Sequence, residues 1–322
     1  MDDALEREHL QLLLQVARWY FGDDLGQSEI ADRIGYSRST VSRLLTEAKR
    51  RGVVRVTIGH PLERQIALEN ALRERFGLRG VRVAQADDGR PILRSVAIAG
   101  AEVLVESVKG ATVLATSAGT TIAALVEELP ILALRDLHVV QMIGALSRTN
   151  PLTDSPEITR RIAERLGGDY RQMPAPLIVG STRLAAALRK EEPVANALAL
   201  ASHADVALVG IGALTDAGGP GRIFEGWLTT AEVDLLKRQG AVGHISAHHF
   251  DAAGRQLEGD LRDRVMSVPL DRLGGIGTVI GVASGPEKVA AIRGAALGHY
   301  IDVLVTDAAT ATAILRVDHP RP

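Results

Sequence analysis

The sequence predicts an α/β protein in which an N-terminal winged helix-turn-helix precedes a larger, mostly parallel α/β domain. Three observations predict this fold. Apolar residues recur every three or four positions over the first 50 residues, and glycines interrupt the pattern. Seven basic residues and one acidic residue lie between Arg33 and Arg55. Beyond Gly80, short apolar runs alternate with helical patterns, as in parallel sheets with crossover helices. We expect the two domains to span residues 1–59 and 60–322.

Composition limits the class of protein. The 322 residues are 46% hydrophobic, carry a net charge of −2 and include no Cys, which excludes disulfides and thiolate metal sites. No apolar run approaches the roughly 20 residues of a membrane span. The acidic N-terminus, MDDALEREHL, lacks the order of a secretion signal. We therefore expect a cytoplasmic protein that does not contact a membrane.

The N-terminal segment divides into three predicted helices and a short strand. The first covers residues 5–20, with an apolar stripe of Leu10, Leu13, Leu14, Ala17 and Trp19 or Tyr20. The second covers residues 27–34, and Gly35 then permits a tight turn. Ser37 caps the third helix, which runs to about Arg51. The third helix is expected to bury Val41, Leu44, Leu45 and Ala48, and residues 53–59 read as the strand of the wing.

This layout predicts that the third helix enters the major groove of operator DNA. The alternative is a small helical bundle whose basic face is exposed to solvent and does not bind DNA. Turn glycine, cap, periodicity and charge agree, so we favour DNA binding, with Arg38 and Arg43 reading bases and Lys49 and Arg50 meeting phosphates. The residues expected to contact DNA lie at the start of the second helix and along the third: Gln27, Ser37, Arg38, Ser39, Thr40, Ser42, Arg43, Lys49 and Arg50.

The second domain contains six apolar runs that predict strands. They lie at residues 112–117, 138–144, 205–212, 242–247, 278–284 and 302–307. Several of these runs end in Gly or Ser and lead into a helical pattern. Because ligands of parallel sheets bind at the carboxyl ends of the strands, the loops after these runs are the expected site.

Two of these loops favour an anion. Ser117, Gly119, Thr120 and Thr121 stand between a strand and a helix start, where free amides and the helix dipole suit a phosphate; an ordinary capped turn is equally compatible. In the other loop Pro286 is expected at the first helical position, which places Lys288 in the first turn. A cation there opposes the helix dipole unless an anion neutralises it.

Over nearly its whole length the chain resembles the SorC/DeoR-type sugar-responsive transcriptional regulators. The stretch QSEIADRIGYSRSTVSRLLTEAKRRGVVRVTI is similar to the DNA-binding module of that family, and GVASGPEKVAAIRGAALGHYIDVLVTDAATATAIL to its C-terminal signature. The resemblance implies an effector domain folded like sugar-phosphate isomerases, a phosphorylated sugar as effector, and a homodimer or homotetramer on the operator. It implies a regulator of carbohydrate metabolism genes, with repression the expected output. By position, the effector-binding residues would be Ser117, Gly119, Thr120, Thr121, Arg148, Asp260 and Lys288.

Alternatives remain beside this interpretation. One is a sugar-phosphate isomerase or deaminase with Lys288 or Asp260 as acid–base group, but no nucleophile–base pair of familiar spacing accompanies them, so we expect no enzyme and no cofactor. His244, His248 and His249 resemble a metal cluster, yet neighbouring strand residues face opposite sides and paired carboxylates are missing, so no metal is expected. The glycine-rich segment 215–226 suits a lid or a plain surface loop equally.

Overall fold

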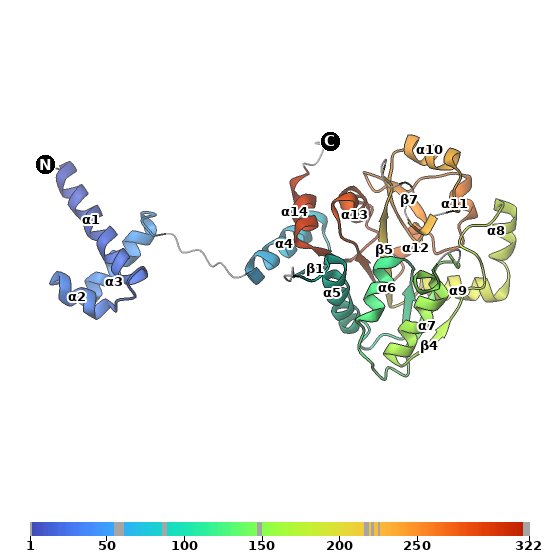
Figure 1. Ribbon diagram of the computed structural model, residues 1–322, viewed down its shortest axis with the longest axis horizontal. Helices are drawn as coiled ribbons and strands as arrows, with labels where there is room; N and C mark the ends of the chain where they lie inside the picture. The colour runs from blue at the N-terminus through green and yellow to red at the C-terminus, as the bar shows by residue number, and fades with distance from the viewer. Residues whose placement is uncertain are drawn as a thin grey trace. The chain divides into compact units, whose positions relative to one another are not determined.

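The computed structural model describes residues 2–54, 61–85, 89–146, 150–215, 219, 222–224 and 226–317. Contacts within the chain divide it into two compact units, residues 1–60 and residues 61–322 (Figure 1). In the described part of the chain, no helix is long and apolar enough to cross a membrane.

The N-terminal unit contains three helices, α1 (Asp2–Phe21), α2 (Gln27–Ile34) and α3 (Arg38–Arg50). Gly35 ends α2 with φ 72°, the left-handed conformation that glycine adopts without strain. Ser37 caps α3 because its hydroxyl accepts a hydrogen bond from the Thr40 amide at 3.2 Å. The helices enclose a core of Leu13, Val16, Ala17, Ile30, Ala31, Val41, Leu44, Leu45 and Ala48.

One expectation for this unit needs correction, and another concerns residues that are mostly outside the described part of the chain. The predicted stripe of α1 is partly wrong, because Leu10 and Leu14 are 39% and 51% exposed while Val16 is fully buried. The buried face of α1 is thus turned relative to the predicted one. Val53 and Val54 form no strand, and residues 55–60 of the predicted wing lie outside the described residues.

The second unit alternates helices and strands along most of its length. Its strands are β1 (Gly80–Ala84), β2 (Val113–Thr116), β3 (His138–Gln141), β4 (Asp169–Arg171), β5 (Val206–Ala213), β6 (Ala241–Ile245), β7 (His248–Asp251), β8 (Thr278–Val282) and β9 (Val303–Asp307). Its α-helices are α4 (Pro61–Phe76), α5 (Ile92–Ser107), α6 (Thr120–Glu127), α7 (Ser155–Leu166), α8 (Thr182–Leu188), α9 (Glu192–Ser202), α10 (Thr230–Arg238), α11 (Asp260–Arg264), α12 (Leu270–Leu273), α13 (Val289–Leu297) and α14 (Ala308–Arg316). Short 3-10 helices cover Pro151–Thr153, Arg222–Phe224 and Pro286–Lys288.

Seven strands form a parallel sheet in the order β1-β9-β8-β5-β2-β3-β4. The remaining two form an antiparallel hairpin, β6–β7, which pairs with the carboxyl-terminal half of β5. Helices α5, α6 and α7 pack side by side, and α4, α14 and α13 pack side by side as a second group (Figure 1). The mostly parallel α/β architecture predicted from the sequence is confirmed.

The order of the strands gathers several loops at one edge. Strands β2, β5 and β8 are neighbours in the sheet and run in the same direction, so their carboxyl ends meet. The loops after β2 and β8 are the two that the sequence singles out, and the β6–β7 hairpin joins them by pairing with β5. The fold therefore assembles one site from segments that lie far apart in the sequence.

Candidate functional site

The loop after β2 leaves the start of α6 open. Gly119 stands before α6 with φ 121°, and no side chain caps the helix. The first amides of a helix have no intrahelical acceptor, so those of α6 point toward whatever lies at its start. Two groups of this loop already form hydrogen bonds within the protein. The Gly119 amide donates to the Thr153 carbonyl at 3.1 Å, and the Ser117 hydroxyl accepts from the Gly210 amide at 3.2 Å.

Lys288 follows β8 on a second loop. The loop turns at Gly285, whose φ is 114°, and continues as a 3-10 helix from Pro286 to Lys288 before α13 begins at Val289. Pro286 thus stands at the first helical position and Lys288 lies in the first turn, which is a 3-10 turn that leads directly into α13. Burial lowers the pKa of the Lys288 ammonium, and the neighbouring Glu287 carboxylate acts in the opposite direction. An anion bound beside the Lys288 ammonium would stabilise its charged form and so raise its pKa again.

These two loops face one pocket of about 620 Å³. Polar walls come from Ser117, Thr120, Thr121, Ser284 and Lys288, and apolar walls come from Ile92, Leu93, Ile143, Ile211 and Ile223. Residues Gly210–Ala213, at the end of β5, also line the pocket. Thr215, at the start of the glycine-rich segment, also lines the pocket, whereas most of that segment lies outside the described residues.

The pocket unites most of the effector-binding residues expected from the sequence. Ser117, Gly119, Thr120, Thr121 and Lys288 all line it. Arg148 lies outside the described residues.

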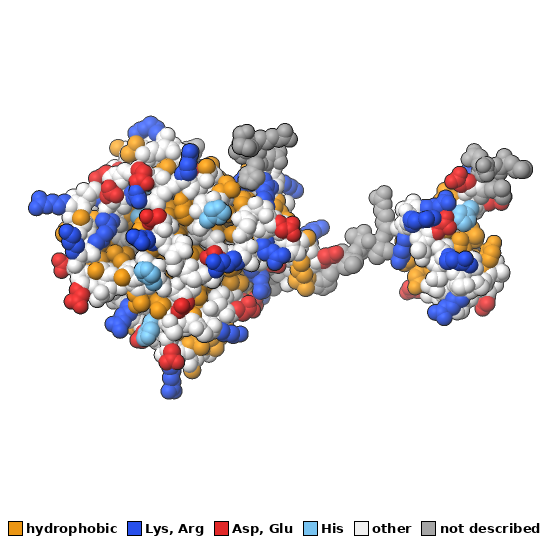
Figure 2. Space-filling model, turned by 180° about the vertical axis from the view of Figure 1, so that it is seen from behind, with side chains coloured by type: hydrophobic (Ala, Val, Ile, Leu, Met, Phe, Trp, Pro, Cys, Tyr) orange, Lys and Arg blue, Asp and Glu red, His pale blue; other side chains and the backbone are white. Residues whose placement is uncertain are grey.

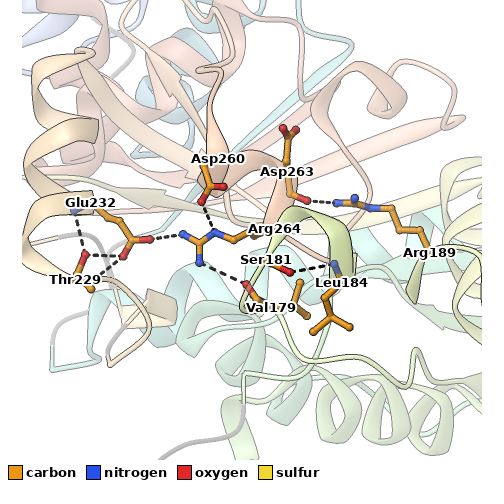
Figure 3. A network of polar contacts seen from close by, with 9 residues as sticks. All are labelled: Val179, Ser181, Leu184, Arg189, Thr229, Glu232, Asp260, Asp263 and Arg264. Atoms are coloured by element: carbon orange, nitrogen blue, oxygen red, sulfur yellow. Dashed lines mark hydrogen bonds and ion pairs between the residues drawn. The ribbon is translucent and has the colours of Figure 1, made fainter. Parts of the chain in front are cut away.

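Asp260 does not line this pocket. It lines a separate, smaller cavity of about 80 Å³ with His249 and Arg262, and its carboxylate accepts a hydrogen bond from Arg264 at 2.6 Å. Arg264 also pairs with Glu232, whose carboxylate completes the capping box of α10 with Thr229, and contacts the Val179 carbonyl (Figure 3). Asp260 is thereby part of a network that ties α10 and α11 together.

The hairpin contributes two pocket residues that sequence reasoning did not assign to the ligand. His244 and Ser246 are each 4% exposed and line the pocket. The His244 Nδ1 and the Ser246 hydroxyl have no hydrogen-bond partner in the described structure. His244 lies in β6, whereas Ser246 follows that strand in the hairpin turn with φ 49°, so no periodicity in the sequence relates the two side chains.

The other two hairpin histidines have structural surroundings. The His248 Nε2 lies 2.9 Å from the Ser267 hydroxyl, and both residues are buried away from the pocket. His249 stacks on Phe224 with ring centroids 4.8 Å apart. Among the described residues, no group of three or more metal-ligating side chains is arranged to hold a metal ion.

On the N-terminal unit, α3 presents its polar residues to solvent. Ser37, Arg38, Ser39, Ser42, Arg43, Lys49 and Arg50 are exposed, and Gln27 and Thr40 are half-buried. Two other basic residues nearby form ion pairs within the unit. Arg33 pairs with Glu29 at 3.1 Å, and Arg51 pairs with Glu47 at 2.8 Å. The Lys49 ammonium lies 5.5 Å from the Phe21 ring centroid. Basic side chains are visible on the surface of this unit in Figure 2.

Comparisons with known proteins relate this chain to proteins that combine a sugar-binding domain with a helix-turn-helix domain. A family model described as "Putative sugar-binding domain" matches residues 60–316, and one described as "Crp-like helix-turn-helix domain" matches residues 10–75. The chain is 32% identical to the deoxyribonucleoside regulator of Bacillus subtilis over 97% of this chain and 99% of the relative. It is also 32% identical to the transcriptional regulator LsrR of Escherichia coli K12 over 98% of each chain.

A solved structure gives the same picture for the fold. The full-length sorbitol operon regulator SorC from Klebsiella pneumoniae superposes with a TM-score of 0.75 and 26% sequence identity. The match covers 96% of this chain and all of that chain.

Proposed function

The chain belongs to the family of sugar-binding transcriptional regulators, and on that premise we propose that it is a DNA-binding regulator controlled by a phosphorylated sugar. Residues 1–59 bind the operator, and residues 60–322 bind the effector and join the subunits. The regulated genes serve carbohydrate metabolism, and the effector changes the affinity for the operator.

One observation carries the choice of a phosphorylated ligand. The uncapped start of α6 and the Lys288 ammonium line the same pocket. Helix-start amides and a cation both stabilise a phosphate, and the hydroxyls of Thr120 and Thr121 add donors beside them. The apolar wall of Ile143 and Ile211 suits the carbon side of a sugar ring.

On the DNA side, α3 acts as the recognition helix. Arg38 and Arg43 project from its first half, and Lys49 and Arg50 from its last turn. Arginine reads guanine through two hydrogen bonds, whereas the end of the helix suits phosphate contacts. Regulators with this motif bind as dimers to two half-sites, so we propose a homodimer or homotetramer.

The pocket is proposed to bind its ligand without chemistry. An isomerase or deaminase needs an acid–base group held beside the substrate. Asp260 lines the other cavity, and the hydrogen-bonded pair of Ser267 and His248 is buried outside the pocket. The relatives from Bacillus subtilis and Escherichia coli are both regulators by name.

The proposal is tested by fluorescence anisotropy of labelled DNA from the region upstream of the protein's own gene. We expect one member of a panel of sugar phosphates to change the affinity by roughly 5- to 150-fold at fixed salt. Lys288→Ala should abolish this change and leave DNA binding without effector intact, because Lys288 lies in unit 61–322. Lys190→Ala, at an exposed site outside the pocket, is the matched control. DNA binding that no sugar phosphate alters would contradict the proposed effector, and absence of DNA binding would contradict the regulator itself.

A further inference from the structure

The loop that carries Lys288 is anchored to the first turn of α14. The Gly285 amide donates a hydrogen bond to the Thr310 hydroxyl oxygen at 2.9 Å, and the Gly285 carbonyl accepts one from the Lys288 amide at 3.1 Å. One backbone group of Gly285 thus bonds to α14 and the other to Lys288. Gly285 and Lys288 both line the pocket at the start of α6. Thr310 is therefore connected to the backbone of Lys288 through one intervening residue.

The hydroxyl of Thr310 is itself oriented by Asp307. Asp307 caps α14, and its carboxylate accepts hydrogen bonds from the Ala309 and Thr310 amides, each at 2.9 Å. The Thr310 hydroxyl donates to the same carboxylate. Because a hydroxyl has one proton, this bond leaves the lone pairs of the oxygen to accept from the Gly285 amide. Asp307 and Thr310 are 3% and 2% exposed, so little water competes for these bonds.

Helix α14 does not need this arrangement for its own stability. A threonine inside a helix can bond to the carbonyl four residues earlier, and Thr312 does so with the Ala308 carbonyl at 2.7 Å. The cap of α14 is already supplied by the Asp307 carboxylate. The Thr310 hydroxyl instead joins that carboxylate to a loop from another part of the chain. Its position serves the loop after β8.

Gly285 makes such an anchor necessary. Its φ of 114° is rare for other residues, and glycine can adopt many other conformations at little cost. The 3-10 turn from Pro286 to Lys288 is short, and hydrogen bonds in such turns have poorer geometry than those of an α-helix. The loop therefore has little of its own to hold one conformation. A bond from the buried Thr310 hydroxyl to Gly285 supplies the missing restraint.

We propose that Thr310, oriented by Asp307, is a positioning residue that holds the Lys288 loop in its ligand-binding conformation before the ligand arrives. This inference rests on the proposed function, because it takes Lys288 to contact the phosphate of the effector. Thr310 is not among the residues that line the pocket, so its effect on binding passes through the loop. A loop fixed in advance raises affinity because less conformational entropy is lost on binding.

Amide hydrogen exchange of the full chain without ligand, followed by NMR, tests the anchor itself. Thr310→Val keeps the shape of the side chain without its hydroxyl, and we expect the Gly285 amide to exchange about three- to tenfold faster than in the wild type. Thr310→Ser keeps the hydroxyl and should restore exchange to within about twofold. Thr312→Val is the matched control, because it removes a hydroxyl whose bond stays within α14. Equal exchange in Thr310→Val and the wild type would overturn the inference.

Isothermal titration calorimetry tests the consequence for binding. The probes are inorganic phosphate, glucose 6-phosphate, ribose 5-phosphate and 2-deoxyribose 5-phosphate. Thr310→Val should weaken binding about three- to tenfold, whereas Thr310→Ser and Thr312→Val should bind within about twofold of the wild type. Because Thr310 acts through Lys288, Thr310→Val should change the affinity less than about twofold in a Lys288→Ala background. A general defect of α14 would weaken binding equally in both backgrounds.

Asp307→Asn gives a second test should Thr310→Val fail to fold. An asparagine still caps a helix, but its amide no longer fixes the direction of the Thr310 hydroxyl, so we expect faster exchange at Gly285 and weaker binding, each by about two- to fivefold.

Two results of the calorimetry would overturn the inference and leave the proposed function standing. One is a normal affinity of Thr310→Val for every compound that the wild type binds, and the other is an equal loss in both backgrounds. If no compound binds the wild-type chain, the proposed effector is overturned, and the exchange rates alone decide whether Thr310 holds the loop.

Discussion

At the scale of single residues, the buried imidazole of His244 links the pocket to the stability of the protein. Its pKa is lowered to about 3, whereas an unfolded chain has a histidine pKa of about 6.5. Between these values the unfolded state binds the additional proton, so the free energy of unfolding decreases as the pH falls. From pH 7 to pH 5, His244 alone should reduce the free energy of unfolding by about 2 kcal/mol.

His244→Phe should remove this share of the pH dependence. Urea unfolding at pH 7 and pH 5 measures it, and a Trp19→Phe background leaves Trp227 as the only tryptophan, so that fluorescence reports on unit 61–322. We expect the free energy of unfolding to fall by about 2 kcal/mol more in the wild type than in His244→Phe between the two pH values. An identical decrease in both proteins would mean that His244 is not neutralised by burial in the native state.

At the scale of elements, the base-reading and phosphate-binding roles proposed for the two ends of α3 differ in the salt dependence that they predict. Neutralising Lys49 and Arg50, as Lys49→Gln/Arg50→Gln, should reduce the slope of log affinity against log salt by about 0.9 for each phosphate that the variant no longer neutralises. Arg43→Gln should instead cost about 1–3 kcal/mol on the operator and relax the preference for one base. Anisotropy titrations on operator and unrelated DNA between 50 and 200 mM salt, roughly the range over which such slopes are read, separate the two effects.

The control for α3 is a double substitution of equal charge on the other unit. Lys109→Gln/Arg135→Gln removes two exposed basic side chains from residues 61–322. We expect its salt slope to equal that of the wild type. If Lys49→Gln/Arg50→Gln also keeps the wild-type slope, the assignment of the last turn of α3 to phosphate contacts is wrong.

The elements also show how far local sequence determines this structure. The bounds of α2 follow directly from the glycines on either side of it, and the capping box of α10 from Thr229 and Glu232. Which face of α1 is buried depends on its packing against α3, so a stripe through Leu10 and Leu14 is an equally good pattern from the sequence. Strand β4 is short and exposed and carries no alternation to detect.

The candidate site divides in the same way. The loops at Ser117 and Lys288 are local strand-to-helix features, so sequence alone places them at the carboxyl edge of a sheet. His244 and Asp260 depend on long-range pairing: β6 meets β5 across a long intervening segment, and that register turns His244 toward the pocket. The short helix that begins at Asp260 is instead held by Arg264 beside another cavity.

At the scale of the whole molecule, the proposed binding of DNA by residues 1–59 and of the effector by residues 60–322 would form a thermodynamic cycle. If the sugar phosphate changes operator affinity by a given factor, operator must change the affinity for the sugar phosphate by that same factor, because the free energy of the cycle does not depend on the order of binding. Calorimetry with and without saturating operator, set beside anisotropy with and without saturating effector, should give equal factors of roughly 5 to 150. His244 lines the pocket, so His244→Phe should change effector affinity in both titrations by the same ratio, and the coupling factor stays unchanged if the β6–β7 hairpin takes no part in the conformational change. A coupling factor that collapses in His244→Phe, with Lys190→Ala unaffected, would instead assign the β6–β7 hairpin to the change that carries the signal to DNA.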